Sequence, residues 1–391
     1  MRLLAFAAVA FALAIGAIGG AVLVCVAGTS IGSLDFVALY AAARLVLLGR
    51  GAAVVDQAAI LEMEHVVAPD RVALLPFVHP PVVAVILAPL AALPLAAAYA
   101  VMVAIGTGAL VAAALLLAPL ARTGQRRVLL AFAVLAPSST VALAQGQTSP
   151  LILLAVALAT RVGPFARGLL LGLAWLRPQV APVFAVAALT DRRSALGMGT
   201  SAALIAAASV ALVGVQGASS YIAQLAGAVD WSVTGALGLE RSVGWTGIAL
   251  AIGAGPAGLV LALASLMIAT VLVVRARRVP PGESRIAPGE SGVPPGESDA
   301  QRLALAGPWS LLASPHALLH DAVLAYPAVA ALATTRGLVA MWCASGVALA
   351  VLQLAGVPLL ALWLLALGVA AARRPEEGPR EERGARRAGT P

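Results

Sequence analysis

Ionisable side chains are scarce in this sequence, so the few that lie beside long apolar segments are the first candidates for chemistry. Asp35 follows the first apolar segment by a few residues, and Arg177 precedes Pro178 inside another. His316 and His320 follow a third apolar segment. A charged side chain at membrane depth is costly unless it is paired or hydrated, so such residues usually mark a functional site.

Asp35 and Arg177 each allow a structural and a functional interpretation. The Asp35 carboxylate can cap the N-terminus of a following helix, or it can take a proton from a hydroxyl group. Arg177 can extend from a helix end to the membrane interface, or it can face a phosphate. Pro178 weakens the helix at this point and frees backbone groups that can line a cavity.

His316, His320 and Asp321 form a third polar cluster. On a helix, His316 and His320 would share one face. That spacing is a weak signal for a metal site, because a third ligand would have to come from elsewhere in the chain. The alternative is that the cluster hydrogen-bonds a phosphate or a sugar, and we expect neither a metal nor a cofactor.

The composition predicts the class of protein. The chain has 391 residues, of which 61% are hydrophobic and 11% are charged, against about 25% charged in soluble domains. Its long apolar segments indicate helices rather than the short alternating strands of a membrane barrel. A soluble enzyme, a disordered chain and a disulfide scaffold are excluded, and an all-α polytopic membrane protein is predicted.

The net charge of +8 comes entirely from arginine, since the chain has no lysine. The arginines cluster between apolar segments and at the C-terminus, which is typical of cytoplasmic anchoring. We therefore expect membrane lipid, and not nucleic acid, as the surroundings of these charges. The predicted location is the plasma membrane, with both termini in the cytoplasm.

The apolar segments predict about eleven or twelve transmembrane helices. The first, over 3–27, is too long for the apolar region of a signal peptide, so we expect an uncleaved helix that starts inside. Residues 28–79 would then form an outer loop that carries an amphipathic helix at the membrane surface. The apolar face of that helix comprises Phe36, Leu39, Tyr40, Ala43 and Leu47.

Composition divides the chain into four parts. Residues 1–274 form an N-terminal transmembrane module, and residues 302–372 form C-terminal transmembrane helices. Between them, 275–301 repeats Pro-Gly-Glu-Ser three times with a period of seven, which predicts a disordered cytoplasmic linker. The charged tail over 373–391 is also expected to be disordered.

Strict alternation of these crossings leaves one discrepancy. It places the arginines of 122–127 on the outside, which the positive-inside rule disfavours. Either one short apolar segment is re-entrant, or these arginines serve a purpose there.

Five segments of the chain, in order, resemble those of glycosyltransferase family 87. Each segment is weakly specific alone, but the ordered set spans roughly residues 35–320. The segments are Asp35-Phe36 with Tyr40 and Gly49, Phe77-Val78-His79-Pro80-Pro81, Gln145-Gly146-Gln147, Gly168–Ala174 with Arg177-Pro178, and Ser314-Pro315 with His320.

The resemblance implies a GT-C fold with its active site on the extracytoplasmic face. It implies a polyprenyl-phosphate sugar donor, usually mannose, and a lipid or glycan hydroxyl as acceptor. Asp35 matches the acid proposed as the base in the family, His320 matches the family histidine, and Arg177 matches the family lysine.

The chain also departs from the family pattern. His79 replaces a tyrosine, and Ser149 stands where the family has asparagine. Leu318 and Leu319 replace tryptophan and aspartate, which bears on contacts to the donor head group and on whether catalysis is retained.

The mechanism that the resemblance implies is an inverting, metal-independent transfer. Asp35 would deprotonate the acceptor hydroxyl as it attacks the anomeric carbon from the face opposite the phosphate. Arg177, with His320, would stabilise charge on the departing phosphate. The residues expected to bind substrate are Tyr40, Arg44, His79, Gln147, His316 and Asp321.

The rival hypothesis is a transporter or flippase for a lipid-linked sugar. It accounts equally well for the helices and for the intramembrane arginine. It also predicts symmetry between two halves of the chain, which the sequence does not display, and it leaves Asp35 without a role.

Overall fold

The structure is a computed structural model that describes residues 31–69, 75–121, 125–233, 241–276 and 297–373. The predicted first transmembrane helix over 3–27, most of the linker and nearly all of the tail lie outside the described residues.

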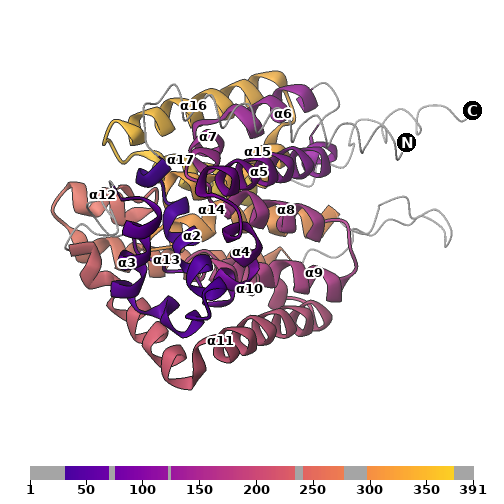
Figure 1. The fold of residues 1–391 in the computed structure, drawn as a ribbon. Helices are drawn as coiled ribbons and strands as arrows, with labels where there is room; N and C mark the ends of the chain where they lie inside the picture. The colour runs from indigo at the N-terminus through magenta and orange to yellow at the C-terminus, as the bar shows by residue number, and fades with distance from the viewer. Residues whose placement is uncertain (1–30, 70–74, 122–124, 234–240, 277–296, 374–391) are drawn as a thin grey trace, which may run out of the picture.

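The described part of the chain is helical throughout and contains no strand (Figure 1). The all-α, polytopic membrane fold expected from the composition is therefore confirmed. The α-helices are α2 (Phe36–Leu47), α3 (Gln57–Val67), α4 (Val82–Ala91), α5 (Leu95–Leu117), α6 (Arg126–Leu135), α7 (Pro137–Ala144), α8 (Ser149–Ala159), α9 (Pro164–Gly172), α10 (Ala181–Leu189), α11 (Arg192–Val233), α12 (Trp245–Ala251), α13 (Gly255–Arg275), α14 (Glu297–Ala313), α15 (Tyr326–Leu332), α16 (Arg336–Leu354) and α17 (Leu360–Ala372). Short 3-10 helices are η1 (Ile31–Ser33), η2 (Gly51–Val55), η3 (Ala118–Leu120), η5 (Leu173–Leu176) and η7 (Leu319–Ala325).

The number of long spans is smaller than the sequence predicted. Among the described residues, four helices are long and apolar enough to cross a membrane, or five if α6 and α7, bent by 41°, count as one span. Six further apolar helices have 10–17 residues. The expected eleven or twelve crossings therefore do not all take the form of long helices, because proline divides some apolar segments into short helices, as at Pro137 and Pro178.

The helix predicted over 36–47 is present as α2, but it is buried on most sides and does not have the single apolar face expected of an amphipathic helix. Nine of its twelve residues are buried. Alanine and other apolar side chains surround this helix, and it packs against α3 and α4. Most faces of α2 are therefore covered by other parts of the protein.

Neighbouring helix ends that carry arginine contact one another. Arg302, near the start of α14, donates a 3.4 Å hydrogen bond to Thr190 at the end of α10. Arg161, after α8, donates to the carbonyl of Leu116 near the end of α5. The starts of α9 and α11 meet so closely that a Cβ at Gly197 would lie 2.0 Å from the Phe165 carbonyl oxygen.

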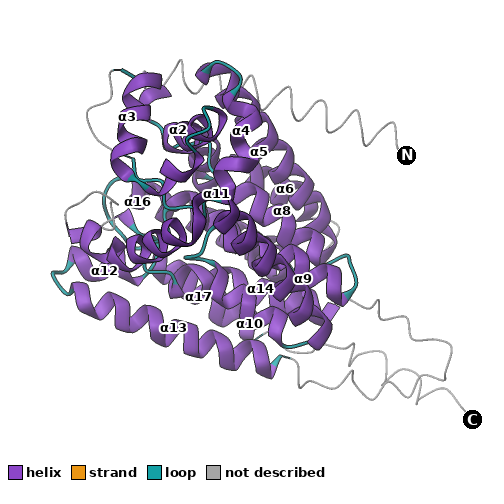
Figure 2. Cartoon of the chain, turned by 60° about the horizontal axis from the view of Figure 1, so that its bottom comes forward, coloured by secondary structure: helices purple, strands orange, loops and turns teal. Residues whose placement is uncertain are grey.

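These ends define one side of the molecule, which we call the arginine end (Figure 2). Four helical paths lead from this end to polar residues at their other ends, namely α6 continued by α7, α8, α9 continued by η5, and α14. The basic residues at the arginine end are Arg126, Arg127, Arg161, Arg167, Arg192, Arg193, Arg275 and Arg302.

Candidate active site

The polar cluster surrounds an open cavity of about 610 Å³. Its wall is assembled from five stretches of chain, namely the start of α2, the segment before α4, the turn before α8, the turn after η5, and the segment that leads into η7. The ionisable and amide side chains on the wall are Asp35, His79, Gln147, Arg177, Gln179, His316 and His320.

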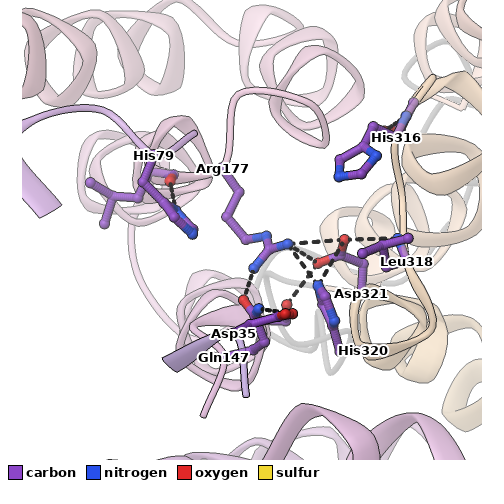
Figure 3. Close-up of polar contacts among 11 residues, drawn as sticks. Asp35, His79, Gln147, Arg177, His316, Leu318, His320 and Asp321 are labelled. Carbon is purple, nitrogen blue, oxygen red and sulfur yellow. Dashed lines mark hydrogen bonds and ion pairs between the residues drawn. The ribbon is translucent and has the colours of Figure 1, made fainter. Parts of the chain in front are cut away.

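Asp35 occupies the N-cap position of α2, but its side chain makes no capping hydrogen bond. Its carboxylate is bound by Gln147, whose Nε2 donates to Oδ2 at 2.8 Å (Figure 3). Its backbone N–H donates to Gln145 Oε1 at 2.9 Å. The carboxylate is therefore oriented by the turn after α7, and the capping interpretation does not describe it.

Gly146 makes this two-sided hold on Asp35 possible. Its φ of +61° lies in the left-handed region that favours glycine. A Cβ at this position would also lie 2.8 Å from Cβ of Phe36, the residue after Asp35. The turn therefore brings the side chains of Gln145 and Gln147 to the same aspartate.

Arg177 lies at the centre of the cluster. It follows η5, where Pro178 ends the helical backbone, and its side chain is 5% exposed. Nη1 donates to Gln147 Oε1 at 2.7 Å, and Nη2 lies 2.9 Å from His320 Nε2. A guanidinium only donates, so His320 Nε2 accepts and the neutral ring carries its hydrogen on Nδ1.

Asp321 forms an ion pair with Arg177 on the side away from the cavity. Its two carboxylate oxygens lie 3.0 and 3.1 Å from Arg177 Nη2. Ser149 Oγ donates to Oδ1 at 2.7 Å, and the backbone N–H of Leu318 donates to Oδ2 at 3.2 Å. Asp321 is fully buried and lies outside the cavity wall. It therefore fixes the guanidinium in one orientation.

Ser149 is a site residue that the sequence did not single out as a candidate. It begins α8 and is fully buried. The only signal was its departure from the asparagine of the family pattern. Its hydroxyl completes the hydrogen bonds of a buried carboxylate, which would otherwise be costly to bury.

His79 and His316 also lie on the cavity wall. His79 Nδ1 is 3.0 Å from the carbonyl oxygen of Leu176. Burial lowers the pKa of His79 and that of His316 to about 4. His316 precedes η7 and His320 lies within it, so the helical pair considered from the sequence does not form. No cluster of three or more metal-ligating side chains occurs in the described ranges.

The structure does not bring Tyr40 and Arg44 to the cavity. Tyr40 Oη donates to the carbonyl of Leu93 at 2.8 Å, and Arg44 Nη1 donates to that of Ala91 at 3.1 Å. Both side chains therefore bind carbonyls at the C-terminal end of α4, and neither lies on the wall. The other predicted site residues lie on the cavity wall, except Asp321, which contacts the wall residue Arg177.

A family model of glycosyltransferase family 87 matches residues 77–287, which is more than half of the chain. The chain belongs to glycosyltransferase family 87. This membership identifies a membrane glycosyltransferase, which requires a sugar donor and an acceptor. No curated protein and no solved structure matches the chain. The region matched to family 87 includes His79, Gln147 and Arg177, and the contacts above join it to Asp35 and His320.

Proposed function

We propose that this family 87 enzyme transfers a hexose, mannose in the first instance, from a polyprenyl-phosphate donor to a hydroxyl of a lipid or glycan. The reaction takes place on the extracytoplasmic face of the plasma membrane. The observation that carries the proposal is the meeting of Asp35, Arg177 and His320 at one cavity, although more than 100 residues separate each from the next along the chain.

The geometry supports a single inverting displacement. Asp35 takes the proton of the acceptor hydroxyl while the hydroxyl oxygen attacks the anomeric carbon of the donor. The bond from that carbon to the phosphate oxygen breaks on the opposite face, so the anomeric configuration inverts. Gln147 orients the Asp35 carboxylate through Oδ2.

Arg177 and His320 are suited to receive the departing phosphate. The Arg177 guanidinium is buried, and its Nε has no hydrogen-bond partner among the described residues. A fixed donor in a site that excludes water stabilises a developing negative charge more strongly than one in water. Asp321 keeps this arginine in place before the donor arrives.

The distribution of arginine supports the proposed side of the membrane. The arginine end lies opposite the cavity along α7, α8 and α14. Because arginine accumulates on the cytoplasmic side, the cavity faces outward. Arg126 and Arg127 lie at the arginine end as well, so the discrepancy left by strict alternation disappears when the ten-residue α4 is the short segment that does not cross the membrane.

A small, mostly apolar pocket lies on the side of η7 where the isoprenoid chain of a lipid-linked donor would run. It shares η7 with the polar cavity, because Leu319, Ala322 and Val323 line the apolar one while His320 lines the polar one. A phosphate beside His320 could therefore be joined to an isoprenoid chain on the other side of η7.

The test is sugar transfer by purified protein with polyprenyl-phosphate mannose and an alkyl mannoside. We expect Asp35→Asn to lower the rate at least about a hundredfold, as for loss of a general base. Asp56→Asn is the matched control, since Asp56 caps α3 on the exposed surface. Transfer near the wild-type rate by Asp35→Asn would exclude Asp35 as the base. Movement of the donor lipid without a new glycosidic bond would favour the transporter hypothesis.

A further inference from the structure

His79 has one ring nitrogen bound to the backbone and a second that is left for a ligand. A carbonyl oxygen only accepts, so the contact with Leu176 places the hydrogen of the ring on Nδ1. The neutral ring then has a bare lone pair on Nε2, which makes this nitrogen an acceptor. His79 lies on the cavity wall with Asp35 and Arg177, and Figure 3 shows His79 on the side of Arg177 away from Asp321.

The surroundings of His79 keep the ring neutral. Burial lowers its pKa to about 4, and the nearby guanidinium of Arg177 acts in the same direction. A neutral imidazole does not compete with Arg177 for an anionic phosphate. It can accept a hydrogen bond from an uncharged hydroxyl without taking the proton.

The backbone that carries His79 is held by side chains from two helices. Gln57 on α3 makes two bonds with Phe77, donating to its carbonyl at 3.3 Å and accepting from its N–H at 3.2 Å. From α11, Gln224 donates to the same carbonyl at 3.3 Å, and Tyr221 donates to the carbonyl of Val78 at 3.2 Å. Such ties fix an irregular segment in one conformation, as a recognition site requires.

We infer that His79 is a specificity-determining residue whose Nε2 accepts a hydrogen bond from a sugar hydroxyl, an inference that rests on the proposed transferase function. Arg177 can only donate, and Asp35 is assigned to removing the proton of the attacking hydroxyl. His79 supplies a neutral acceptor for another hydroxyl, borne either by the transferred sugar or by the acceptor. A site built to bind a hydroxyl discriminates strongly against an analogue that lacks it.

Asparagine and glutamine at position 79 separate this role from a purely structural one. The amide of His79→Asn can replace Nδ1 and keep the bond to Leu176, but it leaves nothing at the place of Nε2. The longer His79→Gln can place an acceptor near Nε2, and it gives up the bond to Leu176. We expect the KM of one substrate to rise about tenfold in His79→Asn and clearly less in His79→Gln.

The two variants are compared with wild type and with His65→Asn, because His65 is exposed on α3. Varying polyprenyl-phosphate mannose and the alkyl mannoside in turn shows which substrate bears the hydroxyl. A deoxy analogue of that substrate should bind wild type and His79→Asn equally. The opposite order, in which glutamine is worse than asparagine, would overturn the inference and assign His79 to the bond with Leu176. Equal effects of both variants, or none, would overturn it as well.

Calorimetric binding of the same two probes to the full-length protein in lipid nanodiscs separates the two proposals. One outcome is that the affinity for a probe falls from wild type to His79→Gln to His79→Asn, while wild type forms no glycosidic bond. The transferase proposal then fails, and His79 remains a hydroxyl-binding residue. If transfer proceeds and binding is insensitive to position 79, only the inference about His79 fails. Binding of neither probe by wild type would overturn both.

Discussion

Gln147 and Asp35 are 112 positions apart in the chain, and the Gln147 amide binds the Asp35 carboxylate at 2.8 Å. Its orientation is fixed from the other side, because Arg177 donates to its oxygen at 2.7 Å and cannot accept. The amide nitrogen must therefore face Asp35, where it favours the ionised carboxylate. One neutral side chain thus links the proposed base to the proposed phosphate-binding residue.

Replacing Gln147 with leucine should uncouple these two residues. We expect kcat/KM for transfer to fall about a hundredfold, since small displacements of reacting groups have effects of that order. Gln216→Leu is a suitable control, because Gln216 is exposed on α11. Steady-state rates of both variants test the prediction, and a Gln147→Leu enzyme of normal efficiency would contradict it.

Asp321→Asn should destabilise the folded protein, because Asp321 is the counter-charge of a buried arginine. A residue that only contacted substrate would have little effect on stability. The change leaves the buried Arg177 guanidinium without a counter-charge, which typically costs about 3–5 kcal/mol. Thermal unfolding of the purified protein measures the loss. Adding Arg177→Met to the same chain should restore part of the stability, because the uncompensated charge is then absent. Additive losses in the double variant would argue against the pairing.

Acid should destabilise the fold partly through His79. The folded-state pKa is about 4, while the unfolded chain takes up a proton near the usual value of 6.5. Between these values the unfolded chain binds more protons, so stability is complete above pH 6.5 and decreases as the pH falls towards 4. The difference in pKa corresponds to about 3 kcal/mol. In His79→Phe, the melting temperature should therefore fall less between pH 7 and pH 4.5 than in wild type, and equal decreases would contradict the prediction.

Labelling of single cysteines should place the cavity and the arginine end on opposite sides of the membrane. Glu62→Cys lies on α3, the helix whose Gln57 binds Phe77 of the cavity wall, and Arg193→Cys lies at the arginine end; both positions are exposed. In a background without Cys25 and Cys343, an impermeant maleimide added to whole cells should label only the first. Labelling of Arg193→Cys before the cells are opened would reverse the proposed orientation.

The sequence identified Asp35, Arg177 and His320 because charged or titratable groups are conspicuous among apolar segments, and the structure brings all three to one cavity. Tyr40 and Arg44 were expected to bind substrate because they lie in the same segment as Asp35. The structure places them instead at carbonyls of α4, since side chains on different sides of one helix meet different neighbours.

Long-range packing explains what the sequence could not predict. Ser149 has meaning only beside Asp321, which is 172 positions away. Similarly, the burial of α2 depends on packing against other helices, which its own sequence does not reveal. Helix type could be predicted from local composition, whereas the length of each span depended on proline and glycine breaks that hydropathy alone overlooks.

The left-handed turn at Gly146 lets the segment after α7 fix the position of Asp35, which lies more than 100 positions earlier in the chain. Gln145 and Gln147 reach Asp35 from either side only while the backbone between them keeps its positive φ. Any larger residue at 146 would strain that turn and collide with Phe36, so both amides would move together. The reactivity of the aspartate is thus set by a residue that has no side chain of its own and never meets the sugar.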